Sequence, residues 1–371
     1  MPLRSTTREI QREVQSGADR DSAMFDGGRP LSFHLELTDK CNAACPMCQR
    51  TLHNDHCATD WSKVANIELT LEDIQGSFTP DFCRRVERID ICGRLGDPPA
   101  ASDCLRICEY LVDQGVFLTI SSNGSLRSEK WWRALGEVFR RNGSFVEFHI
   151  DGLEDTNHLY RVNTRYDKVI GNARAFMETG AAAEWHFILF RHNQHQVEEA
   201  LRRSRELGFR SFKLIDTIRF GDHEQFEYQM PDGTIRRLES PSLEARDVAS
   251  RIRETNADTG RCGAAQPENG PQTRDSVNGI SCKSASENRP YINADGTVSA
   301  CCWVPDSPNE AWLYRRAGKS RRQHSIRNLP LEEILRDEPY ASFYRRSWEE
   351  SASPVCIRKC GRGIKNRRTD L

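Results

Sequence analysis

The sequence lacks any long apolar run. No window of its 371 residues approaches the roughly 18 uninterrupted apolar residues of a membrane-spanning helix. Residues 1–17 are charged and lack the apolar centre of a secretory signal. These absences predict a cytoplasmic protein that has no membrane partner.

The sequence also lacks an excess of charge of either sign. Its 53 Lys and Arg residues balance 54 Asp and Glu residues, which leaves a formal net charge of −1. A nucleic-acid partner is therefore not expected, because such proteins usually carry a strong basic excess. A local basic segment at residues 358–368 is interpreted as a solvated terminus.

Cysteine, in contrast, is abundant. Fourteen cysteines are too many for an ordinary cytosolic chain and too few, at this length, for a disulfide scaffold. Metal binding is the leading explanation for those that cluster. The remainder show no ligand spacing and are expected to be small buried apolar residues: Cys57, Cys83, Cys92, Cys104, Cys108, Cys262 and Cys302.

The chain divides into four parts by its pattern. Residues 1–30 are a leader, 31–220 alternate between strand and helix patterns, 221–281 are a polar linker with a hairpin near residues 231–234, and 282–371 carry a second cysteine group. Alternation of this kind predicts an α/β fold with parallel strands, here a partial (β/α)6 barrel of the TIM type. Its active site is expected at the C-terminal ends of the strands. The expected strands are Leu31–Leu37, Val86–Cys92, Val116–Ile120, Phe145–Ile150, Trp185–Phe190 and Phe212–Ile215.

Three cysteines, Cys41, Cys45 and Cys48, follow directly on the first expected strand. A structural zinc site is closed by four ligands, and a [4Fe–4S] cluster that only passes electrons also takes four thiolates. Three thiolates leave one iron without a protein ligand. The alternative is a zinc site completed by His34, His53 or Cys57.

This C-x3-C-x2-C spacing at the end of the first strand resembles the radical S-adenosylmethionine (SAM) superfamily. The resemblance implies that the amino and carboxylate groups of SAM chelate the open iron. It also implies that the reduced cluster cleaves SAM to a 5′-deoxyadenosyl radical. Met47 occupies the place where the family has a residue packing near the adenine.

Further turns at the ends of the expected strands resemble turns of the same family. Gly96, Asp97 and Pro98 resemble the turn that holds the SAM amino group, although an ordinary tight turn has the same composition. Ser122 and Asn123 lie in a turn similar to the family's "TNG" turn.

The segment after the fourth strand resembles the "SIDG…YR" stretch of family members with extra clusters. By that resemblance, His149 and Asp151 approach the ribose, with His149 standing where Ser is commoner. Arg161 would pair with the SAM carboxylate, which suits a bidentate guanidinium. The alternative is that Arg161 is a helix-surface charge. After the fifth strand, Asn193, His195 and Gln196 would either face SAM or cap the next helix.

The second cysteine group resembles the opening of the SPASM and Twitch modules, which hold auxiliary iron–sulfur clusters. Residues 293–297 predict a hairpin turn that brings Cys301 toward Cys282. Together with Cys356 and Cys360 they would bind one auxiliary [4Fe–4S] cluster. The five cysteines from residue 282 onward indicate the shorter, one-cluster Twitch form, and the spacing from Gly296 favours Cys301 over Cys302 as ligand. A zinc ribbon is the alternative, because four thiolates on a hairpin suit zinc equally.

The resemblance implies an oxidoreductase-type enzyme that abstracts a hydrogen atom from its substrate. A flavodoxin- or ferredoxin-type donor would reduce it, and the auxiliary cluster would accept a second electron. A small biosynthetic intermediate, such as an aminocyclitol or sugar, is favoured because no peptide-binding domain precedes residue 30. The alternatives are modification of a ribosomally made peptide and, remotely, a zinc-stabilised binding protein without activity. No catalytic acid, base or hydrogen donor is identified.

Overall fold

The structure is a computed structural model that describes part of the chain in detail. The described residues are 30–52, 65–217, 219–220, 223–230, 233–258, 280, 282–305, 308–337, 340, 343 and 354–360. The expectations for His53, Cys57 and Cys262, for the leader up to residue 29 and for residues 361–368 lie outside this range.

Six parallel strands form the centre of the protein, as the sequence predicts. They follow the chain order across the sheet, each paired in parallel with the next. The fifth begins three residues earlier than expected, because Ala182 pairs with Phe145 on the preceding strand. The strands are β1 Leu31–Leu35, β2 Val86–Ile91, β3 Phe117–Ser122, β4 Phe145–His149, β5 Ala182–Ile188 and β6 Ser211–Ile215.

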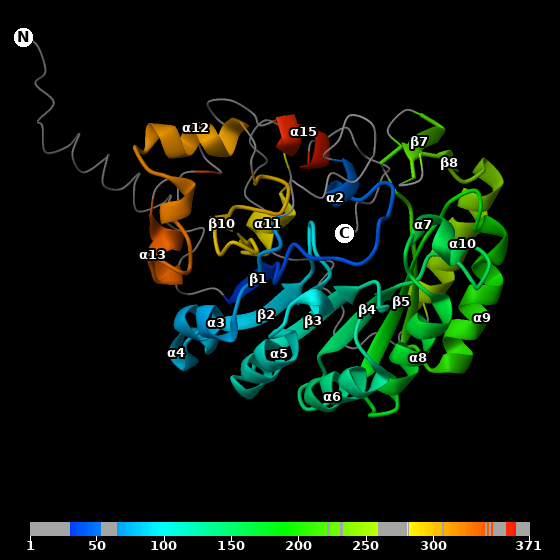
Figure 1. Ribbon diagram of the computed structural model, residues 1–371, viewed down its shortest axis with the longest axis horizontal. Coiled ribbons are helices and arrows are strands. Elements are labelled where there is room, and N and C mark those ends of the chain that lie inside the picture. Colours follow the sequence, from blue (N-terminus) through cyan, green and yellow to red (C-terminus); the bar gives the residue numbers. More distant parts are fainter. Residues whose placement is uncertain are drawn as a thin grey trace, which may run out of the picture.

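Helices cover the outer face of the curved sheet (Figure 1). The main ones are α5 Cys104–Asp113, α6 Glu129–Phe139, α8 Tyr166–Met177 and α9 Val197–Leu207. The amphipathic stretch before β2 forms two short helices, α3 Leu71–Ser77 and α4 Pro80–Cys83. The break occurs because Thr79 caps a new helix that begins at Pro80.

The two faces of the sheet differ in polarity. Residues such as Phe33, Ile89 and Leu118 point outward into one core with the helices. The alternate residues, among them His34 and Asp90, point to the concave side, because successive side chains of a strand face opposite ways. The concave side, here called the lumen, is therefore lined with polar groups.

The sheet contains two strands more than the six-stranded barrel expected. The predicted C-terminal hairpin is present as β9 Tyr291–Ile292 and β10 Val298–Ser299, and β9 pairs in parallel with β1. The amide of Glu36 donates to the carbonyl of Ile292 at 2.9 Å. The pairing satisfies the edge of β1, which would otherwise expose unpaired backbone groups. Ile292 and Val298 also share the barrel's hydrophobic core, so the C-terminal part is continuous with the barrel.

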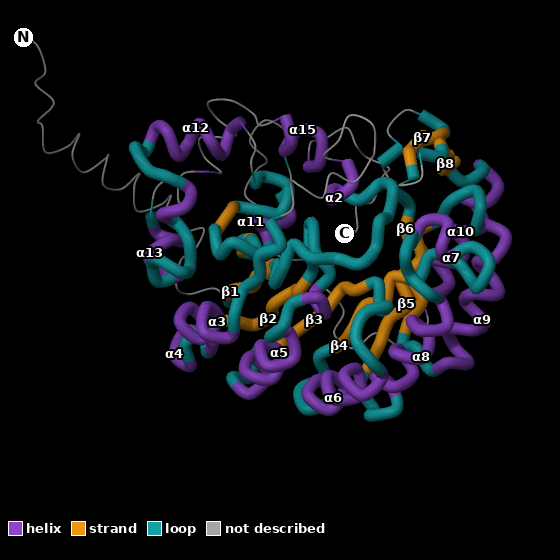
Figure 2. Tube along the Cα trace, viewed as in Figure 1, coloured by secondary structure: helices purple, strands orange, loops and turns teal. Residues whose placement is uncertain are grey.

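The stretch expected to be a linker is partly ordered against the barrel. Its predicted hairpin is confirmed as β7 Gln225–Gln229 and β8 Ile235–Glu239, which pair antiparallel. A helix that the sequence did not predict, α10 Leu243–Asp258, follows it. Figure 2 shows this hairpin beyond the end of β6, on the same side as the short helix α2 Gln49–Leu52.

The remaining short elements lie in the loops of the barrel and in the C-terminal part. They are η3 Pro98–Ala100, α7 Asn157–Tyr160, η4 Gln194–Gln196, α11 Lys283–Ser286, α12 Pro308–Arg316, η6 Arg321–Gln323, α13 Leu331–Arg336 and α15 Pro354–Cys360.

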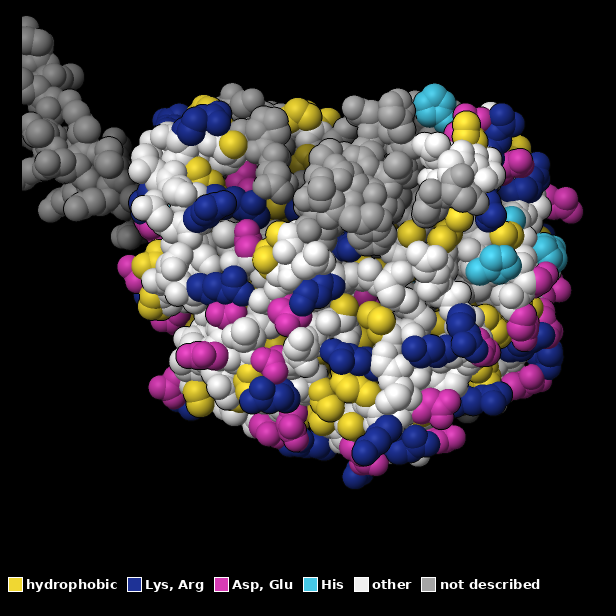
Figure 3. All heavy atoms as spheres, viewed as in Figure 1, with side chains coloured by type: hydrophobic (Ala, Val, Ile, Leu, Met, Phe, Trp, Pro, Cys, Tyr) yellow, Lys and Arg dark blue, Asp and Glu magenta, His cyan; other side chains and the backbone are white. Residues whose placement is uncertain are grey.

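The described part of the chain contains no helix with the length and apolarity needed to cross a bilayer. Over the face in Figure 3, Lys and Arg side chains alternate with Asp and Glu side chains. Mixed charge of this kind agrees with the near-zero net charge of the sequence.

Candidate active site

The three N-terminal cysteines lie in a loop that leaves β1 at its C-terminal end. Cys45 is buried, and Cys41 and Cys48 are half-buried. The loop is held by backbone bonds: the amide of Ala44 donates to the carbonyl of Val162 at 3.0 Å, and the amide of Cys48 donates to Cys45. The predicted placement at the C-terminal mouth of the sheet is confirmed by this geometry.

The turn after β2 packs directly on the cysteine loop. A Cβ atom on Gly96 would lie 1.8 Å from the carbonyl oxygen of Thr38, so only glycine allows this approach. The amide of Asp97 donates to the carbonyl of Lys40 at 2.8 Å. Pro98 then begins η3. The turn and the cysteine loop therefore form one unit.

Glu36 connects this unit to the C-terminal hairpin. One carboxylate oxygen accepts from the amides of Leu95 at 2.6 Å and Gly96 at 3.2 Å. The other accepts from the hydroxyl of Tyr291 on β9. Burial raises the pKa of Glu36, and the Tyr291 and amide hydrogen bonds oppose that rise.

Asp97 organises the turn after β3. Its carboxylate accepts from the amide of Asn123 at 3.0 Å and from the hydroxyl of Ser122 at 3.1 Å. Burial raises the pKa of Asp97 to about 6, although these hydrogen bonds favour its charged form. The amide group of Asn123 then donates to Asn42 at 3.1 Å and lies 3.8 Å from the sulfur of Cys41. The structure thus brings these predicted residues together beside the first cysteine.

Arg161 lies on the opposite side of the cysteine loop. Its Nε donates to Asp151 at 2.6 Å, and its guanidinium lies 3.7 Å from the sulfur of Cys45. The side chain of Arg161 is 14% exposed, which excludes the alternative of a helix-surface charge. The second oxygen of Asp151 accepts from the amide of Ile188. Both oxygens of Asp151 are thus used within the protein, which fixes Arg161 in place.

Asn193 and Gln196 support the same region from beneath. The side chain of Asn193 donates to the carbonyls of Asp151 and Ile188, both at 2.9 Å. Gln196 accepts from the amide of Leu153 at 3.0 Å. Neither makes a side-chain cap to the following helix, and His195 is exposed.

Met47 belongs to a separate apolar cluster over the cysteine loop. It is 1% exposed and packs in a cluster that includes Cys45 and Tyr160. Tyr228 of β7 and Leu238 of β8 belong to the same cluster. The β7–β8 hairpin therefore covers the N-terminal cysteines and limits their contact with water.

His149 is the last residue of β4 and lies on the lumen side, two residues before Asp151. Its ring packs against that of His186 at 5.1 Å between centroids. Burial lowers the pKa of His149 well below its ordinary value, and the nearby charge of Arg161 acts in the same direction.

The C-terminal cysteines come from three separate segments. Cys282 caps α11, Cys301 follows β10, and Cys356 and Cys360 lie one helical turn apart on α15. Cys282 and Cys360 are hydrogen-bonded, and Cys301 is close enough to Cys356 and Cys360 for their charges to interact. The four predicted ligands therefore gather in one place.

Cys301 and Cys302 face different surroundings. The charges that act on Cys302 are those of Arg289, Glu36 and Arg94, which lie toward the lumen. Cys301 interacts with the other C-terminal cysteines instead. This division favours Cys301 as the ligand, in agreement with the sequence spacing.

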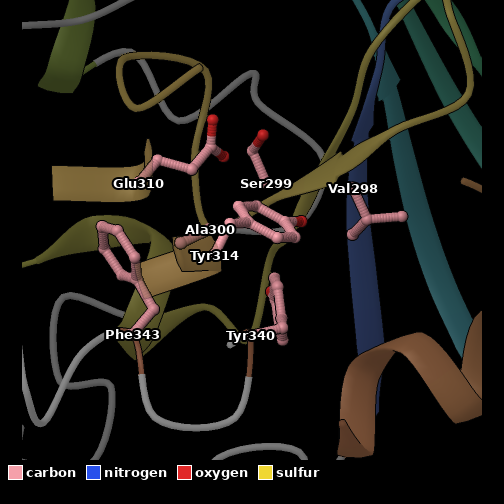
Figure 4. Close-up of a pocket in the computed structure, with 7 residues that line it drawn as sticks. All are labelled: Val298, Ser299, Ala300, Glu310, Tyr314, Tyr340 and Phe343. Atoms are coloured by element: carbon pink, nitrogen blue, oxygen red, sulfur yellow. The ribbon is translucent and has the colours of Figure 1, made fainter. Parts of the chain in front are cut away.

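Aromatic residues pack the C-terminal part behind these cysteines. Figure 4 shows Tyr314 and Tyr340 around a small cavity beside Val298, Ser299 and Ala300 of the β10 region. Burial raises the pKa of the Tyr340 hydroxyl, and Cys301 and Cys282 lie close enough for their charges to act in the same direction. The cavity is thus part of the packing that supports the cysteines.

A single zinc ion is the alternative to a cluster at each cysteine group. Within the described ranges, Glu147, His149 and His186 are the one group of three or more His, Cys, Asp or Glu residues whose ligand atoms all lie within 4.8 Å. No three sulfurs of either cysteine group meet this limit, so side chains would have to rotate for one zinc ion to bind at roughly 2.3 Å from each thiolate. His34 is also engaged elsewhere, since its Nε2 lies 2.9 Å from the carbonyl oxygen of Cys92.

Comparison with known proteins agrees with this geometry. The profile of the SPASM family, described as an iron–sulfur cluster-binding domain, matches residues 282–361. The structure of Streptococcus suis SuiB bound to S-adenosylmethionine is similar at a TM-score of 0.59, with 14% identity over 93% of this chain and 75% of that one. The structure of anSMEcpe with bound AdoMet is similar at a TM-score of 0.56, with 16% identity over 86% of this chain and 81% of that one. Both neighbours were solved with S-adenosylmethionine bound. The chain has the fold of these two proteins, and its C-terminal part matches the SPASM domain.

The radical SAM resemblance read from the sequence is thus confirmed for the fold and for the iron–sulfur nature of the C-terminal part. No curated protein matches the chain significantly. Solved structures with peptides are also similar, including SuiB bound to the precursor peptide SuiA at a TM-score of 0.57, with 13% identity over 92% of this chain and 73% of that one.

Several residues of the radical SAM site were missed in the sequence. Glu36 and Asn42 lie within a few residues of Cys41, and their polarity beside an apolar strand was the available signal. The sequence did not indicate that Tyr228 and Leu238 cover the cysteine loop, because the β7–β8 hairpin has the polar composition of a surface segment.

Proposed function

We propose that this chain is a radical SAM enzyme that abstracts a hydrogen atom from a peptide substrate. The observation that carries the proposal is the triplet Cys41, Cys45 and Cys48 at the C-terminal mouth of a radical SAM fold, with Arg161 beside Cys45. With a [4Fe–4S] cluster and SAM bound, the site would supply reductive cleavage of SAM to a 5′-deoxyadenosyl radical.

The residues around the triplet divide into binding and positioning groups. Arg161 would bind the SAM carboxylate, because its guanidinium offers further donors beyond the one held by Asp151. Asp151 is then a positioning residue. We therefore do not assign it the ribose contact that the resemblance implied.

The turns after β2 and β3 would receive the amino acid end of SAM. The backbone at Gly96, Asp97 and Pro98 lies against the cysteine loop, and Ser122 and Asn123 fix Asp97. Met47 and its apolar neighbours, covered by β7 and β8, would pack near the adenine. A dry apolar wall there would keep water from the radical.

The C-terminal part, residues 282–371, would bind one auxiliary [4Fe–4S] cluster through Cys282, Cys301, Cys356 and Cys360. Four thiolates fill every iron position, so this cluster would transfer electrons or support the fold and would not bind substrate. Removal of a hydrogen atom leaves a one-electron radical, and an oxidation needs an acceptor for the second electron. A flavodoxin- or ferredoxin-type protein would supply the first electron.

A peptide is the better-supported substrate class. Similar structures include SuiB bound to the precursor peptide SuiA and anSMEcpe bound to a Cp18Cys peptide. This reverses the preference drawn from the sequence for an aminocyclitol- or sugar-like molecule, which remains the alternative.

Two assays test the proposal. Anaerobically reconstituted protein should contain about eight irons per chain, and a variant with Cys41, Cys45 and Cys48 all changed to Ala should contain about four. With dithionite and SAM, the wild type should form 5′-deoxyadenosine, measured by mass spectrometry, and the variant should not. Formation of 5′-deoxyadenosine by the variant would refute the SAM site.

The substrate class is tested separately with short peptides encoded beside the gene. A change in peptide mass that depends on SAM, with deuterium passing from labelled peptide to 5′-deoxyadenosine, would support peptide modification. Transfer of deuterium only from a labelled aminocyclitol or sugar would favour the alternative and leave the SAM site standing.

A further inference from the structure

Two neighbouring strands carry the same short pattern. β4 contains Glu147 and His149 separated by one apolar residue, and β5 contains Glu184 and His186 in the same arrangement. The parallel register pairs Glu147 with Glu184 and His149 with His186. Because alternate residues of a strand share a face, all four polar side chains stand together on the lumen side.

Three of these four side chains converge. The ligand atoms of Glu147, His149 and His186 all lie within 4.8 Å of one another. Nε2 of His186 lies 3.9 Å from a carboxylate oxygen of Glu147, too far for a hydrogen bond. Ligands bound to one ion at about 2.1 Å stand roughly 3–4 Å apart, so small rotations of the side chains would complete such a site.

One of these groups lacks the hydrogen-bond partner that a buried polar atom normally has. Among the described residues, Nδ1 of His149 is buried with no hydrogen-bond partner. Such atoms are rare in native structures, and binding of an ion is one recognised explanation. Glu147 accepts from the hydroxyl of Ser121, and no Lys or Arg in the described part of the chain forms an ion pair with it.

The positive charges nearby are already neutralised by other carboxylates. Glu184 pairs with Arg210 at 2.7 Å and with Lys213 at 2.8 Å, and Asp151 pairs with Arg161 at 2.6 Å. Glu184 also lies 3.1 Å from Nε2 of His186, the nitrogen that faces Glu147. An ion bound at that nitrogen would replace this contact, and Glu184 would keep its pairs with Arg210 and Lys213.

We propose that Glu147, His149 and His186 bind one divalent transition-metal ion in the lumen. Two imidazoles and one carboxylate suit Zn²⁺, Fe²⁺ or Co²⁺ better than Mg²⁺ or Ca²⁺, which prefer oxygen ligands. Three protein ligands leave coordination positions open. An oxygen atom of the substrate could occupy one of them and be held near the mouth of the barrel. The site is independent of both cysteine groups and goes beyond the proposed SAM chemistry.

The test measures zinc on protein that already contains its iron–sulfur clusters. Reconstituted protein is freed of loose metal on a chelating resin, equilibrated with Zn²⁺ by dialysis and analysed for zinc and iron by mass spectrometry. Wild type should hold about one zinc per chain more than the variant carrying both His149→Ala and His186→Ala, because the imidazoles supply two of the three ligands. Any zinc bound at cysteines that lack a cluster is present in both proteins, so it cancels when the zinc content of the variant is subtracted from that of the wild type.

The control is His158→Ala, which removes an exposed histidine outside the lumen and should keep the extra zinc. Equal zinc in the wild type and the double variant, at equal iron, would overturn the proposal. If the double variant loses iron because it misfolds, Glu147→Gln decides, since it keeps the size and hydrogen-bonding capacity of the side chain. It should weaken zinc binding at least tenfold at unchanged iron content, and unchanged zinc affinity would overturn the site.

Discussion

Gly96→Ala should separate the turn after β2 from the cysteine loop. The added Cβ would lie 1.8 Å from the carbonyl oxygen of Thr38, and the atoms it meets are backbone atoms that cannot rotate away. Normal contact between non-bonded heavy atoms is roughly 3.5 Å, so one backbone segment must move by more than about 1 Å.

The cost follows from the bonds that this movement breaks. The amide of Asp97 donates to Lys40, and the amides of Leu95 and Gly96 donate to Glu36. At about 1 kcal/mol each, their loss lowers the free energy of unfolding by about 3 kcal/mol. For a chain of this size that corresponds to a fall of roughly 4 °C in Tm.

Gly76→Ala is the matched control. Gly76 is an exposed residue within α3, and a Cβ there would meet nothing within 4 Å. Alanine is favoured over glycine in a helix by roughly 0.5–1 kcal/mol, so this variant should be slightly more stable than wild type.

Both variants are measured by anaerobic differential scanning calorimetry, together with iron content and 5′-deoxyadenosine formation. Gly96→Ala should lose stability and 5′-deoxyadenosine formation together, because the displaced turn carries Asp97 away from Asn123 and the cysteine loop. If Gly96→Ala melts within 1 °C of wild type, as judged against the roughly 4 °C expected, and cleaves SAM normally, the close approach is not required and the reasoning fails.

The other predictions concern the SAM carboxylate and the auxiliary cluster. Arg161→Lys should weaken SAM affinity by about 1–3 kcal/mol, measured by equilibrium dialysis, because Lys keeps the charge and loses the fork; unchanged affinity would contradict the assigned role. Cys301→Ala should lower the iron content more than Cys302→Ala, and equal losses would show that either sulfur can serve. Changing Cys356 and Cys360 together to Ala should keep 5′-deoxyadenosine formation and stop conversion of substrate. Normal conversion by a folded variant would exclude an electron-acceptor role, whereas aggregation would indicate that the cluster chiefly stabilises the fold.

Local patterns in the sequence were sufficient for much of the fold. The alternation of apolar residues identified all six barrel strands, and residues 293–297 identified the β9–β10 hairpin. The triplet of cysteines could be recognised because three ligands in eight residues form a local pattern. Each of these features depends on residues that are close in the chain, where spacing and turn chemistry carry the information.

Contacts between distant residues were decided only by the tertiary structure. Glu36 and Tyr291 are 255 residues apart, and their hydrogen bond depends on the pairing of β9 with β1, which no local pattern indicates. The separation of Cys301 from Cys302 likewise depends on what each faces across the molecule.

The polar groups of the lumen show what the sequence indicates and what it leaves to the tertiary structure. The Glu-x-His pattern of β4 and β5 is visible in the sequence. Because side chains alternate along a strand, the pattern shows only that the Glu and His of one strand share a face. Whether the pairs meet depends on which strands are neighbours and on their register, and a shift of one residue would turn one pair away. The sequence by itself determined the strands, the turns and the cysteine spacing. The tertiary structure decided which of their side chains lie together, because that depends on how elements far apart in the chain pack and pair.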